Sequence, residues 1–172
     1  VNGLDDNVYA TASQILIHYL CAYYNRVSGE GRFANGSNMS LVRTAFLDLG
    51  GFDAMFRHAC GGEDTDFCRR WLDAGKRIVY AHNVVVRHFH TMDFKGFMRQ
   101  HFSYGQGAGI RRRLNWKRRQ PNPALEPLRF YAGMLWYALQ QGGGLPGLPL
   151  VGLLLVSQVA YLIGCLRPGP AD

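Results

Sequence analysis

Three carboxylates lie within four positions of the stretch GGEDTDFCRRWLDAG, residues 61–75. They belong to Glu63, Asp64 and Asp66. A carboxylate that is crowded by other carboxylates is harder to ionise, and once ionised it is a stronger base. Such a group can accept a proton from a substrate hydroxyl while its neighbour holds that hydroxyl in place. The stretch is therefore a candidate site for general-base chemistry.

The same stretch predicts the helix that would carry these acids. One helical face is apolar and consists of Phe67, Cys68, Trp71 and Leu72. Gly75 stands where a helix C-terminal glycine belongs. The acids then occupy the first turn, where the helix dipole favours each anion by roughly 0.3–1 kcal/mol. A purely structural interpretation is also open, with Asp66 and Arg70 forming an exposed surface pair worth tenths of a kcal/mol.

Two histidines, His88 and His90, are the candidate metal ligands. They end the stretch RIVYAHNVVVRHFH, residues 77–90, whose composition predicts a β-strand with alternate residues on one face. One strand histidine needs further ligands from elsewhere, and the chain has neither an HExxH motif nor the Cys/His spacing of a zinc site. A packed or hydrogen-bonded histidine is the alternative.

The remaining elements follow from apolar periodicity and from glycine and proline positions. Residues 8–24 predict an amphipathic helix, and residues 32–43 predict a short strand broken by an Asn-Gly turn. Residues 43–49 predict a short helix that Gly50 and Gly51 end. Residues 92–110 predict a helix that gives way to a loop at its glycines. Asp5 and Asp6 are interpreted as a solvated loop or helix cap.

Charge is distributed unevenly along the chain. The net charge is +7, and residues 94–172 hold 10 Lys/Arg against 2 Asp/Glu. Residues 145–166 are 22 uncharged positions, which as a helix would extend roughly 33 Å, close to a bilayer core. The basic run at residues 111–119 precedes this apolar part, a pattern that favours anionic lipid over nucleic acid. The positive-inside rule then places the run on the cytoplasmic side of the membrane, where the four cysteines are expected to be reduced thiols.

Four segments, in this order and at these gaps, resemble the C-terminal half of inverting glycosyltransferases of family 2. They are SNMSLVR, LGGFDAMF, GGEDTDFCRRWLDAGKRIVYA and VVVRHFH, with a looser match at QHFSYGQGAG. The resemblance implies a GT-A fold, which is an α/β nucleotide-sugar-binding domain. It also implies transfer of a sugar, of the hexosyltransferase type and with inversion, from a nucleotide-diphosphate donor to an acceptor hydroxyl, with a divalent metal (Mg²⁺ or Mn²⁺) at the diphosphate.

The resemblance also assigns roles to individual residues. Asp64 would be the general base that deprotonates the acceptor, and Glu63 would position that acceptor. His88 would be the metal ligand. The positions expected to contribute to acceptor binding are Gly61, Gly62 and Asn38.

One part of the family pattern is not found ahead of the acid pair. The nucleotide-binding strands and the DxD-type motif should lie well before Asp64, so we expect a partial GT-A fold that lacks its N-terminal nucleotide-binding half. The expected organisation is a glycosyltransferase domain over residues 1–110, a basic and proline-containing linker over 111–127, and a membrane-associated helical segment over 128–166.

Two functions are weighed for this organisation. The first is a truncated glycosyltransferase acting on a saccharide or lipid-linked acceptor in polysaccharide or glycolipid biosynthesis, at the cytoplasmic face of a membrane (the inner membrane in a bacterium). The second is a non-catalytic, membrane-anchored binding module for anionic lipid or polysaccharide. No nucleic-acid partner is expected in either case.

Overall fold

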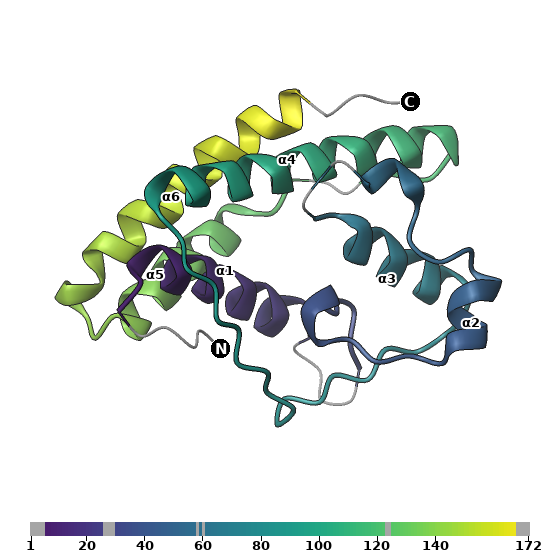
Figure 1. Ribbon diagram of the computed structural model, residues 1–172, viewed down its shortest axis with the longest axis horizontal. Coiled ribbons are helices and arrows are strands. Elements are labelled where there is room, and N and C mark those ends of the chain that lie inside the picture. The colour runs from purple at the N-terminus through teal and green to yellow at the C-terminus, as the bar shows by residue number, and fades with distance from the viewer. Residues whose placement is uncertain (1–5, 26–29, 58, 60, 123–124, 168–172) are drawn as a thin grey trace.

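The computed structural model describes residues 6–25, 30–57, 59, 61–122 and 125–167. In this part of the chain the helices are α1 (Val8–Tyr24), α2 (Arg43–Asp48), α3 (Glu63–Asp73), α4 (Phe94–Lys117), α5 (Leu128–Gln141) and α6 (Leu148–Leu166). Three short 3₁₀ turns accompany them: η1 (Gly36–Asn38), η2 (Ala54–Phe56) and η3 (Leu145–Gly147). Figure 1 shows α1, α5 and α6 gathered together, with α4 running from α6 to the part of the molecule that holds α3.

One apolar core joins the four long helices. Its buried side chains are Ala12, Ile15, Leu16, Tyr19, Met92, Phe97, Phe130, Met134, Ala138, Leu150 and Leu154. The amphipathic helix predicted at residues 8–24 is confirmed, and its predicted apolar face supplies the α1 part of this core. Because α5 and α6 also supply core residues, the predicted membrane-associated segment is part of the same packed unit as α1 and α4.

The beginning of α1 is fixed by Asn7. The Asn7 side chain accepts a hydrogen bond from the backbone N–H of Ala10 at 2.8 Å, as an N-cap residue does. Its amide group donates to the carbonyl of Met92 at 2.9 Å and so ties the helix to the chain that leads into α4. The cap is therefore Asn7 and not Asp6, while Asp5 lies outside the described residues.

The glycines in α4 do not end the helix, contrary to the prediction of a loop there. α4 continues through Gly105, Gly107 and Gly109 to Lys117. A Cβ on Gly105 would lie 2.0 Å from the carbonyl oxygen of Tyr161, and a Cβ on Gly164 would lie 2.0 Å from the carbonyl oxygen of Phe102. These glycines therefore allow the backbones of α4 and α6 to cross in direct contact, which outweighs their cost to the helix.

The two predicted strands do not form in the described part of the chain. Residues 32–43 contain η1, and residues 77–90 are extended, with isolated bridge residues at Ile78 and His88 in place of a strand; Ile78 forms an antiparallel bridge with Gly31. Strand composition indicates side chains that suit a pleated surface, whereas a strand also needs partners for its N–H and C=O groups. The α/β GT-A fold is therefore not confirmed, because the described residues are mostly helical.

The predicted helix ends around α2 and α3 are confirmed. α2 ends before Gly50 and Gly51, whose φ angles are +77° and +64°, and Gly75 follows α3 with φ +71°. These values lie in the left-handed region that glycine adopts at little cost. Farther along, the basic positions 111–117 continue α4, so the expected linker starts inside a helix.

Candidate functional site

Gly61 and Gly62 bring the acid-bearing turn of α3 against α4. Their φ angles are +126° and +102°, which favours glycine at both positions. A Cβ on Gly61 would lie 2.7 Å from the Tyr104 ring, and a Cβ on Gly107 would lie 1.8 Å from the carbonyl oxygen of Gly61. Packing of the loop on α4 is thus one reason for these glycines, and their role in acceptor binding stays a prediction.

The two acids at the start of α3 have different surroundings. Asp64 accepts hydrogen bonds from the backbone N–H of Gly36 (3.2 Å, to Oδ2) and from that of Thr65 (2.6 Å, to Oδ1). Glu63 is half-buried, and its Oε2 atom has no hydrogen-bond partner. Burial, joined by the charge of Asp64, raises the pKa of the Glu63 carboxyl. Asp64 is therefore held as an acceptor by its neighbours, while Glu63 keeps an oxygen for a further donor.

Asp66 is not the exposed surface residue that the sequence predicts. Its side chain is 2% exposed. The predicted pair with Arg70 forms at 2.8 Å, and a second pair forms with Arg118 of α4 at 2.5 Å. Arg118 also binds Asp53 at 2.8 Å, and Arg70 donates to the carbonyl of Gly51 at 2.7 Å. Asp66 thus joins α3 to the end of α4 and to the loop after α2, and it fixes the helix from which the other two acids project.

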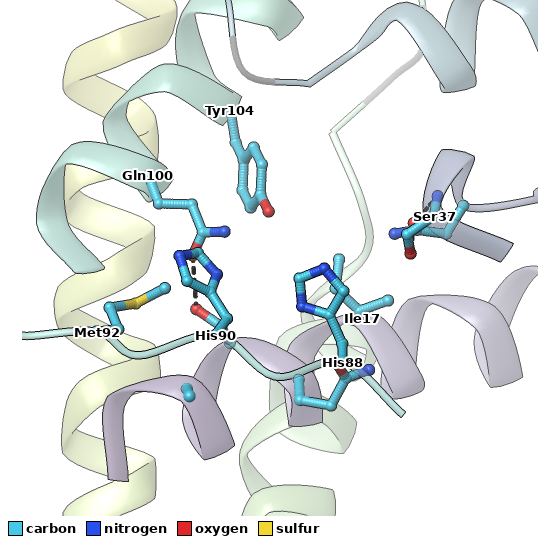
Figure 2. Close-up of a pocket in the computed structure, with 11 residues that line it drawn as sticks. Ile17, Ser37, His88, His90, Met92, Gln100 and Tyr104 are labelled. Atoms are coloured by element: carbon cyan, nitrogen blue, oxygen red, sulfur yellow. Dashed lines mark hydrogen bonds between the residues drawn. The ribbon is translucent and has the colours of Figure 1, made fainter. Parts of the chain in front are cut away.

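A polar pocket of about 160 Å³ lies beside this acid-bearing turn. It is lined by residues of α1, of the η1 turn, of the chain that precedes α4, and of α4 itself: Ala10, Ser13, Gln14, Ile17, Asn35, Ser37, His88, His90, Met92, Gln100 and Tyr104. Figure 2 shows the rings of His88 and His90 and the hydroxyl of Tyr104 directed toward the same space. Hydroxyl, amide and imidazole groups dominate this lining, which suits a ligand rich in hydroxyl groups.

The η1 turn connects the pocket to Asp64. Asn35 and Ser37 line the pocket, and Gly36 between them donates its N–H to the Asp64 carboxylate. The Asn35 side chain accepts hydrogen bonds from the N–H (2.9 Å) and hydroxyl (2.6 Å) of Ser37, which holds the turn in shape. Neither Glu63 nor Asp64 lines the pocket itself, so the acids adjoin it across one turn of the backbone.

Hydrogen bonds between side chains of α1 and α4 hold together the part of the pocket that these two helices line. Ser13 donates to the Gln100 side chain at 3.0 Å, and its oxygen lies 3.1 Å from Nε2 of His101. His101 is 1% exposed, and this burial lowers its pKa to about 4. The ring is therefore neutral at pH 7. Because the Ser13 proton is used toward Gln100, the geometry fits the tautomer in which Nε2 donates to Ser13.

His88 and His90 do not complete a metal site with other described residues. Their ring centroids lie 5.8 Å apart, so the two imidazoles adjoin each other. Among the described residues no three or more His, Cys, Asp or Glu side chains lie together as metal ligands. Imidazole suits transition metals better than Mg²⁺, which prefers oxygen ligands. The described residues do not by themselves fit the expected Mg²⁺ or Mn²⁺ site.

Asn38 lies at the end of η1 with its amide group in use. It donates to the carbonyl of Val84 at 3.0 Å and so fastens the extended chain to the turn. The pocket is instead lined by its neighbours Asn35 and Ser37. Sequence reasoning also missed Ser13 and Tyr104. Tyr104 lies in the loosely matching segment QHFSYGQGAG, whereas the Ser13 position gives no signal before α1 and α4 are packed together.

One comparison with known proteins agrees with the family that the ordered segments of the sequence resemble. A family model described as "Glycosyl transferase family group 2" matches residues 8–167. Because this match covers most of the chain, the chain belongs to glycosyltransferase family 2. The sequence matches none of the curated proteins and none of the solved structures compared with it. Membership of the family makes the chain a glycosyltransferase in general terms, with a nucleotide-sugar donor and an acceptor.

Proposed function

We propose that this chain supplies the acceptor side of an inverting glycosyl transfer to a hydroxyl group. The proposal rests on the acid pair at the start of α3. A single turn, η1, connects this pair to a pocket whose lining suits a ligand rich in hydroxyl groups. Asp64 accepts a hydrogen bond from Gly36, and the residues on either side of Gly36 line that pocket. A base and a polar binding space are thus held side by side by the same short turn.

In the proposed reaction Asp64 takes the proton of the acceptor hydroxyl. The acceptor oxygen then forms a bond to the anomeric carbon of the donor, and the bond from that carbon to the diphosphate oxygen breaks on the opposite face. Glu63 binds the acceptor through the carboxyl oxygen that has no partner in the structure. Burial raises the pKa of this carboxyl above that of an ordinary glutamate.

We also propose that the donor carries a hexose and that His88 is one ligand of a divalent metal. Acceptor binding is proposed to involve Gly61, Gly62 and Asn38. Binding of Mn²⁺ to the full chain, followed by electron paramagnetic resonance, tests the metal without an activity assay. His88→Ala should weaken Mn²⁺ binding more than His90→Ala does. Equal binding by the wild type and by His88→Ala would remove His88 from the metal ligands.

Membrane association is proposed from α6. Among the described residues one helix, Leu145–Leu166, is long and apolar enough to cross a membrane, and only 28% of its most apolar window is buried. This exposure distinguishes it from the core helix of a soluble protein. The cytoplasmic face is proposed because the basic positions 111–119 adjoin this helix and the cytoplasmic leaflet carries anionic lipid.

The same exposed helix favours the second candidate function, a non-catalytic membrane-bound binding module. The two functions are distinguished by transfer of labelled hexose from UDP-, GDP- and dTDP-linked donors to saccharide and polar-lipid acceptors. Glycosyl transfer predicts a product whose anomeric configuration is inverted relative to the donor, and which Asp64→Asn abolishes. Product formation that is unchanged in Asp64→Asn contradicts the assigned base. Saccharide or lipid binding without any product supports the binding module.

A further inference from the structure

α6 has two opposite apolar faces. One face belongs to the protein interior and consists of Leu150, Leu154, Ser157, Ala160 and Gly164. The other, which we call the exposed stripe, consists of Leu148, Leu155, Val159, Leu162 and Leu166. The stripe follows the helix from its first turn to its last, roughly 28 Å at 1.5 Å per residue. No described element covers it, and Figure 1 shows α6 at the edge of the molecule.

The buried face of α6 packs on elements that carry polar and charged groups on their other sides. Its first half shares the core with α1, and the other side of α1 lines the polar pocket through Ser13 and Gln14. Its last turns touch the α4 backbone at Gly105. If α6 crossed a bilayer, α1, the pocket and α4 would enter the hydrocarbon with it. Uncompensated polar and charged groups are costly there.

Charged side chains on α4 limit how far that helix can be immersed. Arg99 is exposed on one side of the α6 crossing and Arg112 on the other. Their positions differ by 13 (112 − 99), so along the helix they are roughly 20 Å apart, which is shorter than the hydrocarbon thickness of about 30 Å. α4 cannot therefore accompany a spanning α6 without placing a guanidinium in hydrocarbon.

Exposed basic groups lie near the C-terminal end of the exposed stripe. Arg167 directly follows Leu166 and is exposed. Arg112 is close enough to α6 to act on the Cys165 thiol, whose pKa is raised chiefly by burial and lowered by this nearby charge. Trp116, one turn after Arg112 on α4, is 82% exposed. Arginine next to anionic headgroups and tryptophan at the interface are typical of membrane-surface contacts.

We propose that α6 lies along a membrane surface and does not cross it. The exposed stripe enters the boundary between headgroups and acyl chains, and Arg112 and Arg167 contact the phosphates of anionic lipid. The occupant of the stripe is therefore a bilayer surface, which accepts a long apolar face bordered by cations. The inference rests on the membrane association proposed above and does not depend on the glycosyl transfer reaction.

Vesicle binding tests the surface and its chemistry. The full chain is mixed with vesicles of phosphatidylcholine containing 30% phosphatidylglycerol and is then sedimented. Leu155→Gln and Val159→Gln should each lower the partition coefficient about tenfold, and Arg112→Gln should lower it about fivefold on these vesicles and little on pure phosphatidylcholine. Val79→Gln, at an exposed apolar position outside α6, is the matched control and should bind as the wild type does.

Depth measurements separate a helix that lies in the surface from one that spans. A fluorophore is attached to the single cysteine of Leu148→Cys, Leu155→Cys or Leu166→Cys, each made in a cysteine-free variant whose circular dichroism matches the wild type. Quenching by lipids labelled at shallow and deep acyl positions should give the same shallow depth at all three positions.

Three results would overturn the proposal. The first is a deep middle position between two shallow ends, which indicates a spanning helix. The second is the absence of vesicle binding by the wild type. The third is a dimer in solution that Leu155→Gln dissociates, because the stripe would then be occupied by a second copy of the chain.

Discussion

Glu63 and Asp64 are neighbours in the sequence, yet the structure gives them different hydrogen-bond partners. Asp64 accepts backbone hydrogen bonds that hold it beside the pocket, whereas Glu63 retains a buried oxygen without a partner. A base needs a fixed position and access to the acceptor, and a positioning group needs unused hydrogen-bonding capacity. The roles that the family resemblance implies for Asp64 and Glu63 stay predictions, and substitution of each residue tests them.

Asp64→Asn tests the base at this position. The amide keeps the shape of the side chain and one of the two oxygens that accept backbone hydrogen bonds, but it cannot take a proton. We expect turnover to fall by at least about a hundredfold, with donor binding nearly unchanged. The turnover of Glu63→Gln should lie between that of Asp64→Asn and that of the wild type, and the apparent KM for the acceptor should be raised. Steady-state transfer and donor calorimetry measure these effects, and wild-type turnover in Asp64→Asn would return the acids to a structural role.

Asp66→Asn is expected to affect stability more than catalysis. The substitution removes the buried charge that binds both Arg70 and Arg118. Because the two arginines are partly exposed and can be rehydrated, we expect a loss of about 2–3 kcal/mol in the free energy of unfolding. Asp73→Asn is the matched control, since its pair with Arg69 on the same helix is long at 3.7 Å and its side chain is 51% exposed. It should cost less than about 1 kcal/mol.

Urea unfolding of the two α3 variants measures this difference. A loss in Asp66→Asn as small as in Asp73→Asn would show that Asp66 does not hold α3 to α4. A loss of activity larger than the loss of folded protein would show instead that Asp66 takes part in the reaction.

At the scale of elements, the contact of α4 with α6 depends on glycine. Gly164→Ala places a methyl group about where the Phe102 carbonyl oxygen already lies, at 2.0 Å. Since backbone cannot move aside as a flexible side chain does, we expect a loss of about 3 kcal/mol or more in the free energy of unfolding. Gly152→Ala in the same helix is the control, because nothing lies within 4 Å of its Cβ position. Gly152→Ala should raise the free energy of unfolding by about 0.5–1 kcal/mol.

Thermal and urea unfolding of both glycine variants provide the comparison. Opposite signs for the two positions in one helix support direct backbone contact between α4 and α6. Equal stabilisation by alanine at both positions would show that the two helices are not in this close contact in solution.

At the scale of the whole molecule, His101 makes stability depend on pH. Burial lowers the pKa of His101 from its usual value of 6.5 to about 4. Between these two values the unfolded chain binds a proton that the folded chain does not, so stability rises with pH in this window and is lost as pH falls. The full loss below pH 4 is about 3 kcal/mol at most.

Urea unfolding at pH 7 and pH 5 measures the contribution of His101. The wild type should be less stable at pH 5, and His101→Gln, which cannot titrate, should lose most of that difference. The Glu63 carboxyl has a raised pKa, which acts in the opposite direction because the folded state binds its proton more readily. The comparison is therefore made between the two chains at each pH. An identical pH dependence in both would exclude the buried histidine as its cause.

The thiols were expected to be reduced, and Cys21, Cys68 and Cys165 are free in the structure, while Cys60 lies outside the described residues. Burial raises the pKa of the Cys68 thiol, and raises that of the Cys21 thiol to about 11. Both groups are therefore poor nucleophiles at pH 7.

Local features were determined by the sequence itself. The apolar periodicity of residues 8–24, the acids at the start of α3 and the glycines after α2 and α3 predict elements that the structure confirms. Each of these signals acts within a few residues, through side-chain spacing, the helix dipole or the φ angles open to glycine. The ordered acid motif in the same way indicated the family to which the chain belongs.

Contacts between distant segments were decided only by the tertiary structure. In the sequence, the glycines of α4 cannot be distinguished from helix breakers, and only the packing of α6 shows their role. Asp66 is likewise predicted to be a surface charge, and only its contact with Arg118, 52 positions farther along the chain, shows that it is buried. The pocket joins Ser13, Ser37, His88 and Tyr104 from separate elements. Spacing along the chain reports on local geometry, whereas burial and close approach depend on which partner arrives across the fold, and that information is not carried by any single segment.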